Sequence, residues 1–192
     1  MKLKIFIIED KSQDAKKLKN NLEIIFQKYK ESELFNTISE GIEVGWIEGE
    51  GEEEQTQYGY FKYYDCKKLI EQLKIILLNN SGCNDIKIGI CLDIKLTRED
   101  AERNITDQEL KTAKKVYNFL QGEKVNVCPI TGIANFDENS INILGEEVND
   151  GFFDKNIIIN ACIDSDIVKM IYFLANGYMP EQEKIDNMFN YD

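Results

Sequence analysis

Five polar side chains of this 192-residue sequence stand directly after short apolar runs. Glu9 and Asp10 follow the first apolar run, Asp93 ends a second, Thr131 follows a third, and Lys155 comes two residues after a pair of phenylalanines. Together they offer three carboxylates, one hydroxyl and one amine. Each alone has an ordinary structural explanation, as a turn residue or a surface charge. Their order along the chain makes the set worth considering as one site.

Three carboxylates held close together repel one another and raise one another's pKa unless a cation neutralises them. Oxygen ligands suit a hard ion such as Mg²⁺. A lysine supplies a positive charge for a phosphoryl group, and a threonine hydroxyl can donate a hydrogen bond to one of its oxygens. An aspartate beside a metal ion and a lysine can act as a nucleophile toward phosphorus and form an aspartyl phosphate. The residue types therefore point to phosphoryl transfer, provided that the fold brings them together.

The elements that must position these residues alternate along the chain. Apolar runs rich in β-branched residues predict strands, and segments with apolar residues at helical spacing predict helices. We expect strands at 3–8, 86–92, 125–130 and 151–153, and helices at 14–29, 65–78, 106–120, 138–148 and 163–174. This alternation predicts an α/β fold with a parallel sheet covered by helices on both faces. Ligands of such sheets bind outside the carboxyl ends of the strands, which is where the five polar side chains fall.

The segment at about 36–64 departs from this alternation. Ile42, Val44 and Trp46 alternate with polar or small residues, and several aromatic residues follow an acidic, glycine-containing stretch. We predict two strands joined by a long exposed turn, an inserted β-hairpin. Nine glutamates and no lysine or arginine lie between Glu31 and Glu54. The insertion either extends the core or presents a surface to a protein partner.

Composition excludes several classes of function. The chain has no histidine, which removes Ser-His-Asp and Cys-His catalysis and histidine-ligated zinc. Its net charge of −12 argues against nucleic-acid binding, which needs clustered lysine and arginine. Five cysteines without a Cys-x-x-Cys pair favour a reducing compartment. Without a recognisable signal peptide or a long apolar stretch, we expect a cytoplasmic protein that binds neither membrane nor nucleic acid.

The sequence resembles the receiver domain of two-component response regulators. The resemblance rests on Ile7–Asp10, Leu92–Leu96, Ile130–Gly132 and Gly151–Lys155, in this order and at these places relative to the strands. It implies a doubly wound, flavodoxin-like sheet of five parallel strands with helices on both faces. The single receiver-like domain would span residues 1–177, with the insertion at about 36–64, and a short C-terminal tail would occupy 178–192.

The resemblance also implies a metal site and a phosphoacceptor. Carried over by position, Asp93 accepts the phosphoryl group. Glu9 and Asp10, together with Asp93 and the backbone carbonyl of Lys95, bind Mg²⁺.

The remaining motif residues carry over in the same way. Thr131 is the hydroxyl that turns toward the phosphoryl group, Lys155 contacts that group, and Phe152 occupies the aromatic switch position. A histidine kinase or phosphotransfer protein would donate the phosphoryl group, and a downstream protein effector would respond.

Several positions depart from the common receiver pattern. Thr97 stands where proline is frequent, Gly132 replaces the usual alanine, and Asn156 replaces the usual proline. The stretch from Asp10 to Asp93 is also longer than usual. These departures predict an atypical receiver.

Two alternatives belong to other classes. One is a degenerate, non-phosphorylated receiver fold that binds a protein partner through its acidic insertion. The other is a phosphatase of the haloacid dehalogenase type, which also uses an aspartate at a strand end. Such enzymes need a second acid two residues after the nucleophile, and here that position is Lys95. We therefore favour the receiver and expect that the protein is not an enzyme.

Overall fold

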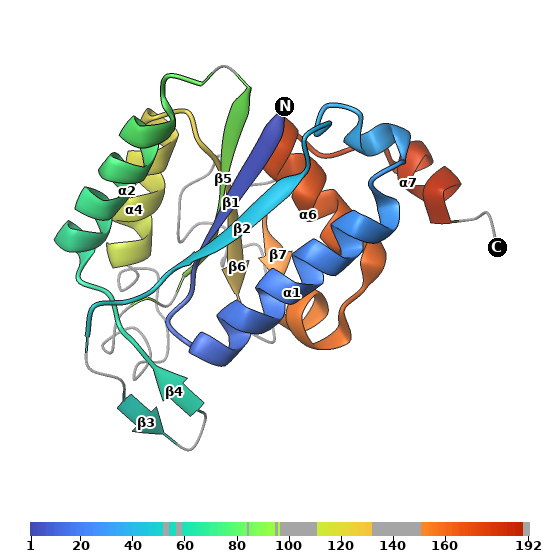
Figure 1. The fold of residues 1–192 in the computed structure, drawn as a ribbon. Helices are drawn as coiled ribbons and strands as arrows, with labels where there is room; N and C mark the ends of the chain where they lie inside the picture. The colour runs from blue at the N-terminus through green and yellow to red at the C-terminus, as the bar shows by residue number, and fades with distance from the viewer. Residues whose placement is uncertain are drawn as a thin grey trace.

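The core of the molecule is a five-stranded, all-parallel β-sheet (Figure 1). The computed structural model describes residues 1–51, 54–56, 59–83, 85–94, 96, 111–131 and 151–189. The strand order is β2-β1-β5-β6-β7. The strands are β1 (Lys2–Ile8), β2 (Ile42–Ile47), β5 (Ile86–Asp93), β6 (Asn126–Thr131) and β7 (Phe153–Asp154). The fold class predicted from the sequence, a flavodoxin-like α/β arrangement with a separate hairpin, is thus confirmed.

Helices cover both faces of the sheet. Helices α1 (Ser12–Tyr29) and α6 (Asp164–Asn176) pack on one face, whereas α2 (Cys66–Asn80) and α4 (Lys111–Gly122) pack on the other (Figure 1). The helix predicted at 106–120 corresponds to α4 in its described part. The helix predicted at 138–148 lies outside the described residues.

Alternation along the strands supplies a separate apolar core to each face. Leu3, Ile5 and Ile7 of β1 pack with α1 and α6, and Ile90 and Leu92 of β5 pack with α2 and α4. All five side chains are fully buried. Because both faces are covered, strands β1 and β5 are apolar almost throughout, which is why the sequence predicted them well.

One glycine sets how closely a helix approaches the sheet. A Cβ atom at Gly89 of β5 would lie 2.8 Å from the Cβ of Leu174 in α6. A larger residue at this position would therefore push α6 away from β5.

The predicted pairing within the insertion is wrong. The run from Ile42 was expected to form a hairpin with the aromatic segment near residue 60, but it is β2, the edge strand, parallel to β1 with Leu3 opposite Ile42. The hairpin is smaller and joins β3 (Glu54–Thr56) to β4 (Gly59–Phe61). In this edge strand Val44 is buried between exposed Glu43 and half-buried Gly45, so its sequence alternates as that of a hairpin strand does. The pattern alone therefore does not distinguish the two.

Residues 178–189 fold back onto the domain. Helix α7 (Gln182–Phe189) packs against α6, and Ile185 is only 3% exposed. The ring of Phe189 meets that of Tyr29 edge-on at 5.2 Å between centroids. The segment expected to be a tail therefore contains a helix that contributes to the core of the α1–α6 face.

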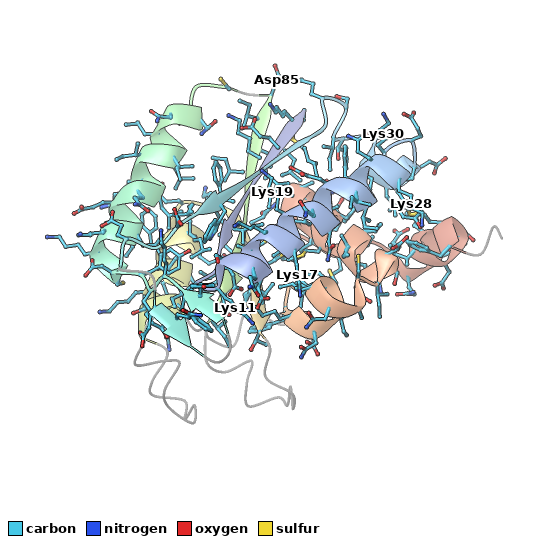
Figure 2. The ribbon with its side chains drawn as sticks, turned by 60° about the horizontal axis from the view of Figure 1, so that its bottom comes forward. Lys11, Lys17, Lys19, Lys28, Lys30 and Asp85 are labelled. Carbon is cyan, nitrogen blue, oxygen red and sulfur yellow. The ribbon has the colours of Figure 1, made fainter. Side chains whose placement is uncertain are left out.

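Lys17 and Lys28 of α1, and Lys30 directly after it, are exposed to solvent (Figure 2). Among the described residues, no helix has both the length and the apolar character needed to cross a membrane.

Candidate functional site

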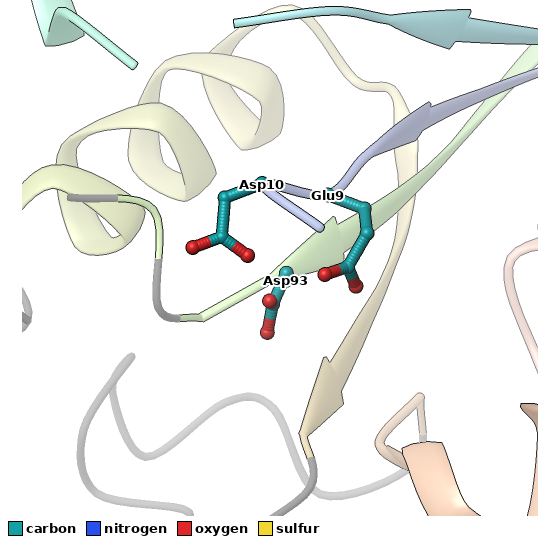
Figure 3. A group of neighbouring side chains, drawn as sticks. All are labelled: Glu9, Asp10 and Asp93. Atoms are coloured by element: carbon teal, nitrogen blue, oxygen red, sulfur yellow. The ribbon is translucent and has the colours of Figure 1, made fainter. Parts of the chain in front are cut away.

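The predicted acidic residues meet at the carboxyl edge of the sheet. Glu9 and Asp10 directly follow β1, and Asp93 is the last residue of the neighbouring strand β5. Each offers a carboxylate oxygen within 4.8 Å of the others (Figure 3). All three residues are buried, with exposed fractions of 0%, 4% and 3%. Parallel neighbours that end at the same level place these carboxylates together, as the sequence predicted.

Lys155, which directly follows the edge strand β7, extends its side chain into this cluster. It lies between β7 and the π-helical turn η2 (Asn156–Ala161), and its side chain is 15% exposed. Its Nζ atom lies 3.0 Å from Oδ2 of Asp93 and 2.8 and 2.6 Å from Oε1 and Oε2 of Glu9. The same ammonium lies 3.8 Å from Oδ2 of Asp14. Lys155 thus bridges two of the three buried carboxylates, Glu9 and Asp93.

The electrostatics of the cluster favour an additional positive charge. Burial and the nearby charge of Asp93 raise the pKa of Glu9 well above its ordinary value. The same two causes, burial and then Asp93, raise the pKa of Asp10 to about 7, although Lys155 acts against them. Burial alone would lower the pKa of Lys155, but Asp93 and Glu9 outweigh it, so the pKa lies above its ordinary value and the ammonium stays charged. One lysine is therefore insufficient to neutralise the acids.

The three carboxylates could hold a metal ion. Their donor set consists of oxygens alone, which suits a hard cation. Three carboxylates and one ammonium leave two negative charges, which is the charge that one divalent cation would balance. Lys155 pairs with Glu9 and Asp93, and the pKa of Asp10 is still raised, so the lysine leaves negative charge for such a cation to balance.

The other predicted site residues lie at the same edge. Thr131 ends β6 and is 1% exposed, one residue beyond Ile130, which is the register partner of Asp93. Thr131 in turn pairs in register with Asp154, the residue before Lys155. Phe152 is partly buried against the core of the α2–α4 face. Lys95, whose backbone carbonyl was predicted to bind the metal, lies outside the described residues.

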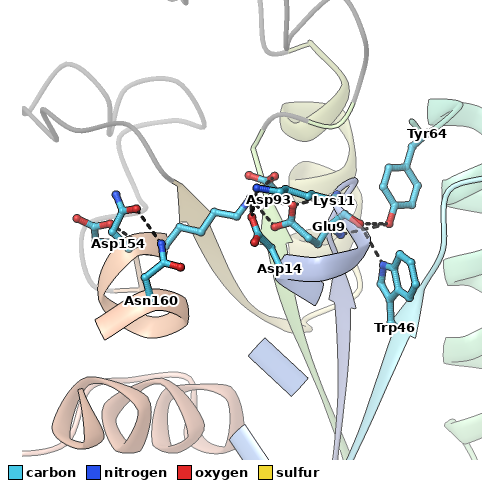
Figure 4. Close-up of polar contacts among 10 residues, drawn as sticks. Glu9, Lys11, Asp14, Trp46, Tyr64, Asp93, Asp154 and Asn160 are labelled. Atoms are coloured by element: carbon cyan, nitrogen blue, oxygen red, sulfur yellow. Dashed lines mark hydrogen bonds and ion pairs between the residues drawn. The ribbon is translucent and has the colours of Figure 1, made fainter. Parts of the chain in front are cut away.

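Two aromatic residues near the site were not predicted as part of it (Figure 4). The indole Nε1 of Trp46 donates a hydrogen bond to the backbone oxygen of Glu9 at 3.0 Å. The backbone amide of Glu9 donates to the hydroxyl of Tyr64 at 3.2 Å, and that hydroxyl also contacts the backbone oxygens of Glu9, at 3.1 Å, and Ile47. The sequence carried a weak signal, aromatic residues flanking the insertion, but not their partner.

Asp14 is a further missed residue. It lies in the first turn of α1, 3.6 Å from Nζ of Lys11 and within ion-pair distance of Lys155. The backbone amide of Lys11 donates to Oε1 of Glu9 at 3.1 Å. An acid in the first helical turn after the Glu9–Asp10 pair was the available signal, because that turn starts at the same sheet edge.

Several glutamates of the acidic segment form ion pairs within the described part of the chain. Glu43 contacts Lys2, Glu48 contacts Lys62 and Glu50 contacts Lys68, each at 2.7 Å, and Glu40 lies 3.7 Å from the N-terminal ammonium. Of the aromatic residues that follow the acidic stretch, Tyr64 is buried and Tyr60 is 40% exposed. Much of the insertion therefore serves the domain's own structure.

Comparisons with known proteins found no matching family model, no matching curated protein and no matching solved structure. The fold and the site themselves define the class: an α/β protein with a parallel sheet and a buried cluster of carboxylates and a lysine at the carboxyl ends of its strands.

Proposed function

We propose that the protein is a phosphoacceptor receiver domain that takes a phosphoryl group onto Asp93. The observation that carries the proposal is the ion pair of Lys155 with Asp93, at 3.0 Å, beside two further buried carboxylates. A structural salt bridge needs one acid for one lysine, whereas this site gathers three acids at a strand edge where ligands of parallel sheets bind. The residual negative charge of the carboxylates favours binding of a cation, and the Lys155 ammonium can contact an anionic phosphoryl group.

The group transfer itself is simple to balance. A carboxylate oxygen of Asp93 attacks the phosphorus atom of the donor, the new O–P bond forms, and the bond from phosphorus to the donor's leaving group breaks. The leaving group departs with the electron pair of that bond. When the donor is acetyl phosphate the leaving group is acetate, and when it is a phosphohistidine the leaving group is the imidazole of the partner.

Mg²⁺, bound by Glu9, Asp10 and Asp93, would neutralise the acids and the oxygens of the incoming phosphoryl group. Lys155 would exchange part of its contact with the carboxylates for a contact with the phosphoryl group. Thr131, at the end of the strand next to Asp93, would donate its hydroxyl hydrogen to a phosphoryl oxygen. The backbone carbonyl of Lys95 completes the proposed ligand set.

Phosphorylation of Asp93 would signal by shifting the domain between two conformations that differ at its surface. In this proposal Phe152 is the aromatic switch residue, and its packing changes when Thr131 turns toward the phosphoryl group. Phe152 is placed for this role because it lies beside β7 and against the α2–α4 core. The chain contains no histidine, so a phosphohistidine donor would lie on another protein, a histidine kinase or a phosphotransfer protein. A downstream protein effector would bind the phosphorylated form.

Acetyl phosphate tests the proposal directly. Wild-type protein incubated with acetyl phosphate and Mg²⁺ should gain the mass of one phosphoryl group, measured on the intact protein, and chelation of the metal should prevent the gain. Asp93→Asn should gain nothing. Asp85→Asn, which changes an exposed aspartate away from the site, is the matched control and should behave as wild type.

Other outcomes would point elsewhere. No mass gain under any condition, with wild type and Asp93→Asn indistinguishable, would refute phosphoacceptance and leave the non-phosphorylated binding module. Continuous release of inorganic phosphate from an aryl phosphate would instead indicate a phosphatase. The intramolecular ion pairs of the glutamates weaken the case for a binding module based on the acidic segment.

A further inference from the structure

Tyr64 lies where the segment between β2 and α2 crosses the end of β1. Its side chain is buried, with 6% of the residue exposed, and its backbone amide donates to the oxygen of Leu96 at 3.0 Å. The hydroxyl therefore has a fixed place between the carboxyl ends of β1 and β2, beside the residue that begins the acidic pair.

The donors and acceptors around the Tyr64 hydroxyl can be matched with one another. A phenol carries one hydrogen and two lone pairs, so it accepts from the amide of Glu9 and donates to one carbonyl. Because the indole of Trp46 already donates to the oxygen of Glu9, the Tyr64 hydrogen is available to the oxygen of Ile47. Burial raises the pKa of Tyr64, which keeps that hydrogen in place. Both backbone groups of Glu9 and the end of β2 are thereby satisfied by two side chains.

The same segment also holds Asp10. The backbone amide of Lys62 donates to the oxygen of Asp10 at 2.8 Å, and Lys11 forms an isolated antiparallel bridge with Phe61. Trp46 at the end of β2, together with Phe61, Lys62 and Tyr64, thus holds the backbone around the acidic pair. We name residues 46–64 the strap.

We propose that Tyr64 is a positioning residue that holds the backbone of Glu9 and thereby sets the carboxylates of the site at the spacing a divalent cation requires. The inference deepens the proposed function, because it rests on those carboxylates binding Mg²⁺. Mg²⁺ demands near-ideal octahedral geometry, so a small displacement of one ligand lowers its affinity. Removal of groups that orient metal ligands typically costs about 10- to 100-fold in affinity.

The test compares Tyr64→Phe with two controls. Tyr64→Phe keeps the ring and removes the hydroxyl. Tyr60→Phe makes the same chemical change on the exposed strand β4. Val116→Ala shortens a fully buried side chain of α4, so it destabilises the fold without removing any of the hydrogen bonds to Glu9. Calorimetric titration gives the Mg²⁺ dissociation constant of each variant, and thermal unfolding without Mg²⁺ gives its stability.

We expect the Mg²⁺ dissociation constant to rise about 10-fold or more in Tyr64→Phe and to be unchanged in both controls, although Val116→Ala melts earlier. Hydrogen exchange of the Glu9 amide, measured by NMR without metal, should accelerate in Tyr64→Phe and remain slow in the controls. If Tyr64→Phe does not fold, Trp46→Phe removes the other hydrogen bond to Glu9 and should weaken Mg²⁺ binding in the same direction.

The failures are distinguishable. Equal Mg²⁺ affinity and equal Glu9 exchange in wild type and Tyr64→Phe would overturn the positioning role and leave the proposed function intact. An equal loss of affinity in Val116→Ala would show that general destabilisation is the cause and would also overturn it. Absence of Mg²⁺ binding by the wild type would overturn the proposed function itself, together with this inference.

Discussion

Replacing Asp10 by asparagine should stabilise the metal-free protein, and the gain should depend on pH. Asp10 is 4% exposed, and burial together with the charge of Asp93 raises its pKa from 3.8 to about 7. An acid whose pKa is raised by folding stabilises the folded state while it is protonated. That stability is lost as the pH rises from the unfolded pKa toward the folded one, here between about pH 4 and about pH 7.

The size of the effect follows from this shift. A rise of roughly three pKa units corresponds to about 4 kcal/mol of unfavourable free energy for ionised Asp10 above pH 7. Asparagine removes the charge but remains a buried polar group, so we expect about half of this, about 2 kcal/mol, to be recovered. In a domain of this size that raises Tm by roughly 4–8 °C.

The assay is thermal unfolding followed by circular dichroism in the presence of a chelator, at about pH 8 and about pH 5. Asp10→Asn should melt above wild type at the higher pH and close to it at the lower pH, where Asp10 is already protonated. The control Asp85→Asn, at an exposed turn, should match wild type at both. A gain that is equal at both pH values, or a loss at the higher one, would refute the electrostatic reasoning.

Three further predictions concern other parts of the structure. Lys155→Met should lower the free energy of unfolding by about 3 kcal/mol at about pH 8, because it removes the ammonium that pairs with two buried carboxylates. A loss under about 1 kcal/mol in urea denaturation would contradict this. Trp46, the single tryptophan, donates a hydrogen bond to the backbone oxygen of Glu9. Its fluorescence emission should therefore change during a Mg²⁺ titration of wild type and not of Asp93→Asn. Mg²⁺ binding detected by calorimetry without a change in emission would argue against this contact. Ile185→Ala should cost about 2–4 kcal/mol because α7 belongs to the core, whereas Ile24→Ala at an exposed position of α1 should change stability by less than about 0.5 kcal/mol.

The sequence was sufficient to predict the acidic cluster because the rule behind it is local. Glu9, Asp10 and Asp93 each follow a run that is apolar on both faces, and such runs become neighbouring parallel strands whose ends coincide. The strand partner of Ile42–Ile47 could not be predicted in the same way. Its alternating pattern fits an edge strand and a hairpin equally, and the choice depends on nonlocal packing against β1.

The role of Tyr64 and Trp46 could not be predicted from the sequence either, because it also depends on nonlocal packing. Both act through hydrogen bonds to the backbone of Glu9, at separations of 55 and 37 residues along the chain. A backbone partner leaves no trace in residue types or spacing. Only the position of β2 beside β1, which the pattern left ambiguous, brings the two rings to the end of the acidic strand.

The extra length between α1 and β5 is therefore part of the site's architecture. The glutamates from 31 to 54 account for nine of the twelve net negative charges of the chain. Their ion pairs with Lys2, Lys62 and Lys68 anchor the segment at β1, within the strap and at α2. Exposed pairs of this kind contribute little free energy individually, but three of them along one segment restrict its register. The strap carries Trp46 and Tyr64, so this register decides whether their hydrogen bonds reach Glu9.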